Sequence, residues 1–132
     1  MVRTSSRPTV VILDDEPLAR QLLRRYLARY GYETFETETV DAAVAALREG
    51  QVAAAILDVR LPEARTGLDV LREFRREVPG TAVPVIILTG SMLSDEEEAE
   101  VTRQRGFLFR KPESLDVLMK FLDQLLGRDQ PQ

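Results

Sequence analysis

The sequence of 132 residues predicts one α/β domain, in which a five-stranded parallel sheet lies between two layers of helices. Short apolar runs alternate with amphipathic segments along the whole chain, and that order implies parallel strands joined by right-handed crossovers. Hydrophobic residues make up 44% of the chain, which argues against disorder. No apolar run reaches the roughly 18 residues of a membrane span, so no contact with a membrane is expected.

The first half of the chain is predicted to form two strand–helix pairs. A β-branched run predicts a strand at Thr9–Leu13, and a helix follows at about Pro17–Tyr30, capped by one of the two acids before its first proline. The run Glu33–Glu36 predicts a weak second strand, and Thr39 is expected to cap a helix that continues to about Arg48. The buried stripe of the first helix is expected to consist of Leu18, Leu22, Tyr26 and Tyr30, joined by Ala19, Leu23 and Leu27. Its arginines, Arg20, Arg24, Arg25 and Arg29, are expected to lie in solvent.

The second half repeats the pattern three times. The apolar run Ala53–Leu57 ends in a single carboxylate, Asp58, and is typical of a strand buried on both faces. Ser94 and Glu97 have the spacing of a capping box, so the acids around them are explained by a helix start and need no metal. The remaining elements are expected to be helices at about Gly67–Glu77 and from Ser114 to about Leu126, and strands at Val83–Leu88 and Phe107–Phe109.

The chain has no cysteine and no histidine. The lack of cysteine excludes a disulfide framework, and a cytoplasmic location is expected. The lack of histidine excludes imidazole bases and imidazole ligands, so any metal must be held by oxygen, which favours Mg²⁺. The formal net charge of -4 provides no overall attraction to nucleic acid. Residues 1–8 and 128–132 are expected to be tails of a domain at 9–127.

Polar side chains follow the carboxyl ends of four predicted strands. Asp14 and Asp15 follow the first strand and Asp58 follows the third, while Thr89 and Lys111 follow the fourth and fifth. In a parallel sheet of order 2-1-3-4-5 these strand ends lie at the same edge. The switch point of the sheet, where the strand order reverses, lies between the first and third strands. Packed carboxylates repel one another unless a divalent cation is present, and a hydroxyl and an ammonium beside them are suited to moving a phosphoryl group. Each residue alone is explained as a cap, turn or surface residue, but the ordered set predicts that Asp58 is a nucleophile.

The chain resembles the receiver domain of two-component response regulators, of the single-domain chemotaxis-regulator type, over about Thr9–Leu126. The matching motifs are VVILDDEP at 10–17, ILDVRLP at 56–62, ILTG at 87–90 and RKP at 110–112. The resemblance implies a flavodoxin-like three-layer sandwich with five helices on both faces. It also implies a phosphorylation-switched signalling domain of a two-component or phosphorelay system, which catalyses only its own phosphorylation and dephosphorylation.

The resemblance assigns roles around the acids. Asp58 would accept a phosphoryl group, forming an aspartyl phosphate, from the phosphohistidine of a sensor histidine kinase or a histidine phosphotransfer protein. Mg²⁺, or Mn²⁺ as an alternative, would be bound by Asp15 directly and by Asp14 largely through water. Asp58 and the backbone carbonyl of Arg60 would complete the protein ligands.

The resemblance also implies a route for the signal. Thr89 and Lys111 would bind the phosphoryl oxygens, and the bond from Lys111 to Pro112 is often cis in this family. On activation Thr89 moves toward the phosphoryl group, and the face built from the fourth helix, fifth strand and fifth helix changes its affinity. A downstream protein target or a second copy of the chain would bind that face, without direct contact with nucleic acid.

The sequence departs from the family pattern at two places, an aromatic position in the fifth strand and the loop after Pro62. The family usually has tyrosine or phenylalanine three residues before the lysine, where this chain has Leu108. Phe107 and Phe109 flank it, and a one-residue slip in register would bring either ring to the position of the missing aromatic. The loop between Pro62 and Gly67, read EART, has one residue more than is common.

Further side chains bear on regulation and partners. The guanidinium of Arg60 is expected either to reach the site and modulate the lifetime of the phosphoryl group or to lie in solvent. Val117 and Phe121 extend the apolar stripe of the last helix, which indicates either burial under a neighbour or contact with a partner. The sequence shows no DNA-binding or enzymatic segment after Gly127, so output is expected by docking to another protein, with a fragment cut from a larger regulator as the alternative.

Two other functions fit parts of the pattern. A Mg²⁺-dependent phosphatase or phosphotransferase could use the same aspartyl nucleophile, but such enzymes usually have a second aspartate at the position that Arg60 occupies. A receiver-like interaction module that is never phosphorylated would not need all five site residues, although Leu108 leaves room for it.

Overall fold

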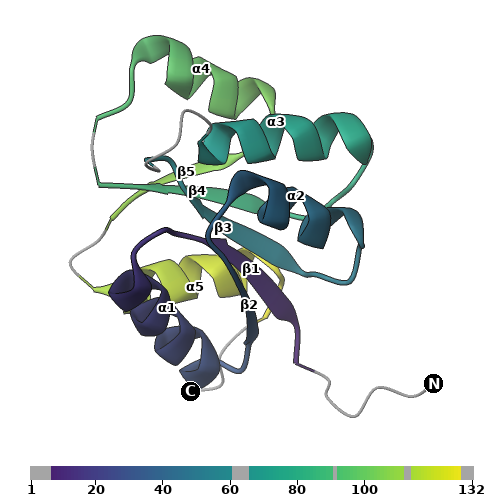
Figure 1. Ribbon diagram of the computed structural model, residues 1–132. Coiled ribbons are helices and arrows are strands. Elements are labelled where there is room, and N and C mark those ends of the chain that lie inside the picture. Colours follow the sequence, from purple (N-terminus) through teal and green to yellow (C-terminus); the bar gives the residue numbers. More distant parts are fainter. Residues whose placement is uncertain (1–6, 61–65, 91, 112–113, 129–132) are drawn as a thin grey trace.

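The predicted sheet is confirmed by a computed structural model, which describes residues 7–60, 66–90, 92–111 and 114–128 (Figure 1). Within these ranges the strands pair in parallel in the order β2-β1-β3-β4-β5. The strands are β1 (Thr9–Leu13), β2 (Glu33–Thr37), β3 (Ala54–Asp58), β4 (Val85–Thr89) and β5 (Phe107–Arg110). The helices are α1 (Pro17–Arg29), α2 (Val40–Arg48), α3 (Gly67–Glu77), α4 (Asp95–Arg103) and α5 (Leu115–Leu125).

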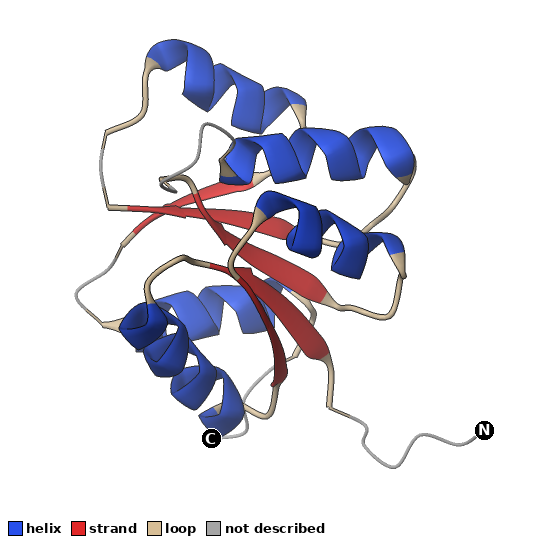
Figure 2. Cartoon of the chain, viewed as in Figure 1, coloured by secondary structure: helices blue, strands red, loops and turns tan. Residues whose placement is uncertain are grey.

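The helices cover the two faces of the sheet unequally. Helices α2, α3 and α4 lie on one face, and α1 and α5 lie on the other (Figure 2). Alternation along β3 explains the two cores, because Ala55 and Leu57 pack toward the first group while Ala54 and Ile56 pack toward the second. Strands β3 and β4 are buried along their whole length, as expected for parallel strands covered on both faces. No helix in the described ranges is long and apolar enough to cross a membrane.

Four strands, β2, β3, β4 and β5, end one residue later than the sequence predicts. Strand β3 includes Asp58 and strand β4 includes Thr89, so both polar residues are fixed by the sheet. Strand β4 begins at Val85 rather than Val83 because Pro84 has no N–H to donate, although the Pro84 carbonyl still accepts a hydrogen bond from the Ala55 N–H at 3.1 Å.

The predicted buried stripe of α1 is wrong in its first half. Leu18 is 74% exposed and Leu22 is 47% exposed, whereas Leu23 and Leu27 are buried. Both pairs have the same four-residue spacing, and the pair five residues further along faces the sheet. Leu22 instead lines a hollow of about 220 Å³ at the carboxyl edge of the sheet, next to Asp14.

Tyrosine–aspartate hydrogen bonds join the segment between α1 and β2 to α5. The Tyr30 hydroxyl donates to Asp116 at 2.8 Å, and the buried Tyr32 hydroxyl donates to Asp123. The guanidinium of Arg128 lies 4.4 Å from the centre of the Tyr32 ring. These contacts tie both the first turn of α5, through Asp116, and its last turn, through Asp123, to the segment between α1 and β2.

The Tyr32 contact predicts a late tyrosine titration. Burial and the hydrogen bond to Asp123 raise the pKa of Tyr32 from 10.0 to about 12. A raised pKa in the folded state means that the stabilisation is complete below pH 10 and is lost as the pH rises toward 12. Because the chain has no tryptophan, ultraviolet absorbance follows tyrosinate directly. We expect Tyr32→Phe to remove the last ionisation step and Tyr26→Phe to leave it in place, whereas loss of the last step in both variants would contradict the assignment.

Candidate functional site

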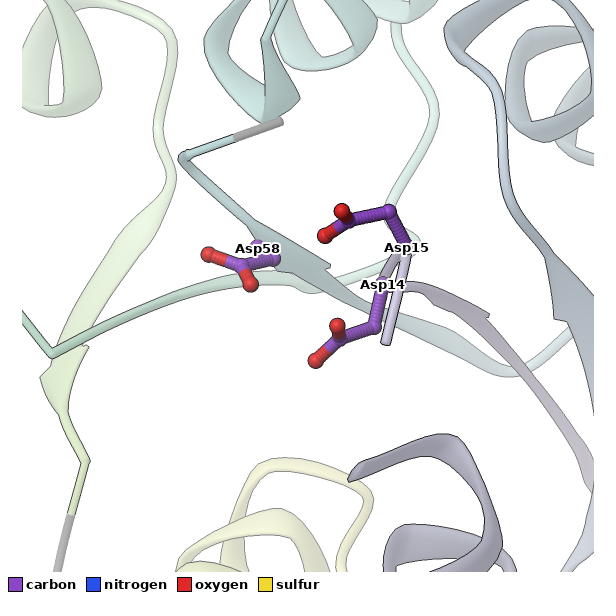
Figure 3. Close-up of side chains that lie close together, drawn as sticks. All are labelled: Asp14, Asp15 and Asp58. Atoms are coloured by element: carbon purple, nitrogen blue, oxygen red, sulfur yellow. The ribbon is translucent and has the colours of Figure 1, made fainter. Parts of the chain in front are cut away.

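Three carboxylates meet at the switch point of the sheet. Asp14 and Asp15 directly follow β1, and Asp58 is the last residue of the neighbouring strand β3 (Figure 3). One carboxylate oxygen from each residue lies within 4.8 Å of those of the other two. Three oxygens this close together could converge on one Mg²⁺, which takes oxygen ligands at about 2.1 Å. An all-oxygen donor set also suits Mg²⁺ rather than a softer metal.

Burial raises the pKa of two of these three carboxyl groups. Asp14 and Asp58 are buried, whereas Asp15 is exposed. Burial raises the pKa of Asp58, and the charges of Asp14 and Asp15 add to that effect, while the Arg60 N–H and Lys111 oppose it. Burial likewise raises the pKa of Asp14, against the hydrogen bond from the Glu16 N–H. A cation bound between the carboxylates would relieve both the burial of charge and their mutual repulsion.

The N-cap of α1 is one of the two acids that the sequence predicts, but the capping contact differs. Glu16 occupies the N-cap position and its side chain makes no capping hydrogen bond. The Asp14 carboxylate instead accepts a hydrogen bond from the Glu16 N–H at 2.9 Å. The turn that leads into α1 therefore holds one oxygen of the site in place.

The predicted phosphoryl-binding groups lie at the ends of the next two strands, Thr89 on β4 and Lys111 directly after β5. Nζ of Lys111 is 3.9 Å from Oδ2 of Asp58, and its side chain is partly exposed. A Cβ on Gly90 would lie 3.3 Å from Cδ of Lys111, so the lysine stem passes directly over this glycine. Thr89 is buried at the end of β4, and its carbonyl accepts a hydrogen bond from the Lys111 N–H at 2.7 Å.

Arg60 contributes to the site through its backbone and to α4 through its side chain. Its N–H donates to Oδ1 of Asp58 at 3.1 Å. Its guanidinium lies 3.5 Å from Oε2 of Glu97 and 3.3 Å from the carbonyl oxygen of Met92. Arg60 thus connects the end of β3 to the start of α4.

Gly67 is a site residue, although its sequence pattern predicts only the start of a helix. A Cβ at this position would lie 2.3 Å from the carbonyl oxygen of Asp58 and 3.2 Å from Cβ of Leu57. Thr66 caps α3 directly before it, with a capping box completed by Asp69. The helix can therefore begin against the backbone of Asp58 only because residue 67 lacks a side chain.

Strand β5 places its leucine and its phenylalanines on opposite faces. Leu108 pairs with Ile87 and packs against the core beneath α3 and α4. The rings of Phe107 and Phe109 lie 5.8 and 5.4 Å from that of Phe121 in α5. No slip in register brings either ring to the side of Leu108. The Lys111–Pro112 bond and most of the loop after Arg60 fall outside the described residues.

Comparison with known proteins agrees with this geometry. Residues 10–123 match the family model of the response regulator receiver domain. The probable transcriptional regulatory protein TcrX of Mycobacterium tuberculosis is 33% identical over 129 residues, which cover 97% of this chain and 54% of that protein. The chain therefore spans about half the length of this curated relative.

Solved structures share the same architecture. The chemotaxis protein CheY4 of Vibrio cholerae matches with a TM-score of 0.80 at 24% identity, covering 92% of this chain and 100% of that chain, which is a likeness of fold alone. The response regulator TrrA of Thermotoga maritima, solved in complex with Mg²⁺-BeF, matches with a TM-score of 0.76 at 26% identity. That match covers 90% of this chain and 99% of the other.

Proposed function

The chain belongs to the response regulator receiver domain family, and on that premise we propose that Asp58 accepts a phosphoryl group from a phosphohistidine donor. The observation that carries the proposal is the meeting of Asp14, Asp15 and Asp58 beside Lys111 at the switch point. In the transfer the P–N bond of the donor breaks, its electron pair stays on the imidazole nitrogen, and a P–O bond forms to a carboxylate oxygen of Asp58.

The surrounding groups have separate roles in this transfer. Mg²⁺ bound by the carboxylates, with the Arg60 carbonyl as a further ligand, would offset the negative charge of the phosphoryl oxygens. Mn²⁺ fits the same oxygen donors. The Arg60 N–H fixes the orientation of the Asp58 carboxylate, and the Lys111 ammonium and Thr89 hydroxyl bind the incoming oxygens. The donor is a sensor histidine kinase or a histidine phosphotransfer protein.

An acyl-phosphate donor and intact mass spectrometry test the proposal. With Mg²⁺ present, wild-type protein is expected to gain the mass of one phosphoryl group, and a chelator is expected to prevent the gain. Multiple turnover of a phosphate ester would indicate an aspartyl-nucleophile phosphatase instead. No gain in mass with any donor would indicate an interaction module.

We propose that the face formed by α4, β5 and α5 binds the downstream partner. Val117 is 55% exposed on α5, near Phe121 and the partly exposed Phe107. Of the residues that the structure describes in α4, only Val101 is buried. Ion pairs join α4 to the rest of the domain: Arg60 to Glu97, Arg72 to Glu100 and Arg110 to Glu98. A helix held by so few apolar contacts can change its position at low cost, which suits a surface that changes affinity for a protein target or a second copy.

Removing the Arg60 side chain is expected to shorten the lifetime of the phosphoryl group. The guanidinium spans from the end of β3 to Met92 and Glu97, and Arg60→Ala opens that side of the site to water. We expect severalfold faster loss of the phosphoryl group, measured by intact mass against time. Arg72→Ala is the matched control because Arg72 also binds α4, through Glu100. Equal decay rates in wild type and Arg60→Ala would overturn this role.

A further inference from the structure

Arg20 is largely covered beside the acids, contrary to the expectation that the arginines of α1 lie in solvent. Its side chain is only 12% exposed. Nη1 donates to the carbonyl oxygen of Asp14 at 2.7 Å. Nε lies 3.4 Å from Oε1 of Glu36, and Nη2 lies 3.8 Å from Oε2 of Glu38. One guanidinium therefore connects α1, the residue after β1, and the end of β2.

Other contacts hold the rest of Asp14. Its N–H donates to the carbonyl of Thr37 at 3.2 Å, and one carboxylate oxygen accepts from the Glu16 N–H at 2.9 Å. The buried Thr37 hydroxyl donates to the carbonyl of Ile12 at 2.7 Å, which fastens β2 to β1 just before the acids. Arg20 holds the remaining backbone atom of Asp14, the carbonyl that leads into Asp15.

We propose that Arg20 is a positioning residue for binding of the divalent cation. Its hydrogen bond to the Asp14 carbonyl fixes the orientation of the peptide between Asp14 and Asp15, and through it the orientation of the two carboxylates. The inference rests on the proposed function, because it concerns the same cation site. The peptide plane between the two aspartates is fixed by this hydrogen bond before any ion binds. Without it the β1–α1 turn must become ordered when the ion binds, and that ordering weakens affinity.

The charge of Arg20 and its hydrogen bond to Asp14 are expected to have opposite effects on Mg²⁺ affinity, so a substitution can separate them. Arg20 is a cation near an acidic site, so removing its charge alone would favour Mg²⁺ binding. Removing its hydrogen bond to the Asp14 carbonyl would disfavour binding. Arg24 provides the comparison, because it lies one turn along α1 and pairs with Glu36 but is half-exposed and has no hydrogen bond to Asp14 among the described contacts.

The experiment is a titration of ¹⁵N-labelled protein with MgCl₂ at constant ionic strength, without a phosphoryl donor. We expect Arg20→Met to weaken Mg²⁺ binding about 10-fold, the usual size of such effects. We expect Arg24→Met to leave binding unchanged or slightly tighter. Arg20→Lys keeps the charge but loses the planar fork of donors, so its affinity should fall between those of wild type and Arg20→Met.

Amide signals of the Mg²⁺-free proteins separate positioning from general destabilisation. The signals of Asp15 and Glu16 should shift or broaden in Arg20→Met and stay in place in Arg24→Met. Mg²⁺ affinity in Arg20→Met equal to or tighter than wild type would overturn the proposal. A wild-type protein that binds no Mg²⁺ would instead contradict the proposed function, so the two failures are distinguishable.

Discussion

Asp58→Asn is expected to abolish phosphoryl uptake while leaving the fold intact. The asparagine amide has nearly the same shape as the carboxylate, and its oxygen can still accept the hydrogen bond from the Arg60 N–H. It lacks the nucleophilic oxygen that forms the acyl phosphate. Intact mass after incubation with Mg²⁺ and an acyl-phosphate donor should show no gain, where wild type gains one phosphoryl group. A similar gain in both proteins would place the acceptor elsewhere.

The same substitution is expected to stabilise the Mg²⁺-free protein. Burial and the neighbouring acids raise the pKa of Asp58 in the folded state. A raised carboxyl pKa favours folding most at pH below the ordinary value of 3.8, and that contribution is lost as pH rises through the folded-state pKa. At neutral pH the charged group therefore opposes folding, and Asp58→Asn removes that opposition. In urea denaturation at neutral pH without Mg²⁺, the midpoint of Asp58→Asn should be higher than that of wild type. Adding Mg²⁺ should raise the midpoint of the variant by less than it raises that of wild type.

Gly67→Ala is expected to cause the largest loss of stability among these changes. The new methyl group would lie 2.3 Å from the carbonyl oxygen of Asp58, so either α3 or the end of β3 must move. Overpacking against fixed backbone costs about 3 kcal/mol. The displacement also reaches the phosphoryl acceptor, so phosphorylation should be slower in whatever protein folds.

Gly80→Ala is the matched control for that prediction. Gly80 has a positive φ of 84°, but a Cβ there meets no atom within 4 Å. Its expected cost is about 1 kcal/mol, from the left-handed backbone alone. The free energies of unfolding of both variants come from denaturant titrations. A loss in Gly67→Ala no greater than that in Gly80→Ala would show that the close approach to Asp58 is not required.

The strands could be placed to within one or two residues from the sequence, because the apolar runs stop at polar residues. That is why the sheet order and the grouping of Asp14, Asp15 and Asp58 followed from the pattern. The sequence could not show that Leu18 and Leu22 are exposed while Leu23 and Leu27 are buried, because the two pairs have the same spacing. Only the packing of the helix on the sheet decides between them.

Two site residues were missed for a different reason. Gly67 matters because the backbone of Asp58 passes close to it, and no local pattern records that contact. Arg20 looks like its exposed neighbours in the sequence, yet its guanidinium lies against Asp14, Glu36 and Glu38. Contacts between side chains and distant backbone depend on tertiary structure, and a helical charge pattern does not encode them.

The central claim is that Asp58 carries the phosphoryl group, and peptide mapping tests it most directly. Borohydride reduction converts an aspartyl phosphate to homoserine, which marks the acceptor permanently. Trypsin cleavage at Arg48 and Arg60 releases the peptide EGQVAAAILDVR, in which Asp58 is the only aspartate. We predict homoserine at Asp58 in wild-type protein treated with Mg²⁺ and an acyl-phosphate donor. Homoserine at any other aspartate, with Asp58 unmodified, would contradict the account.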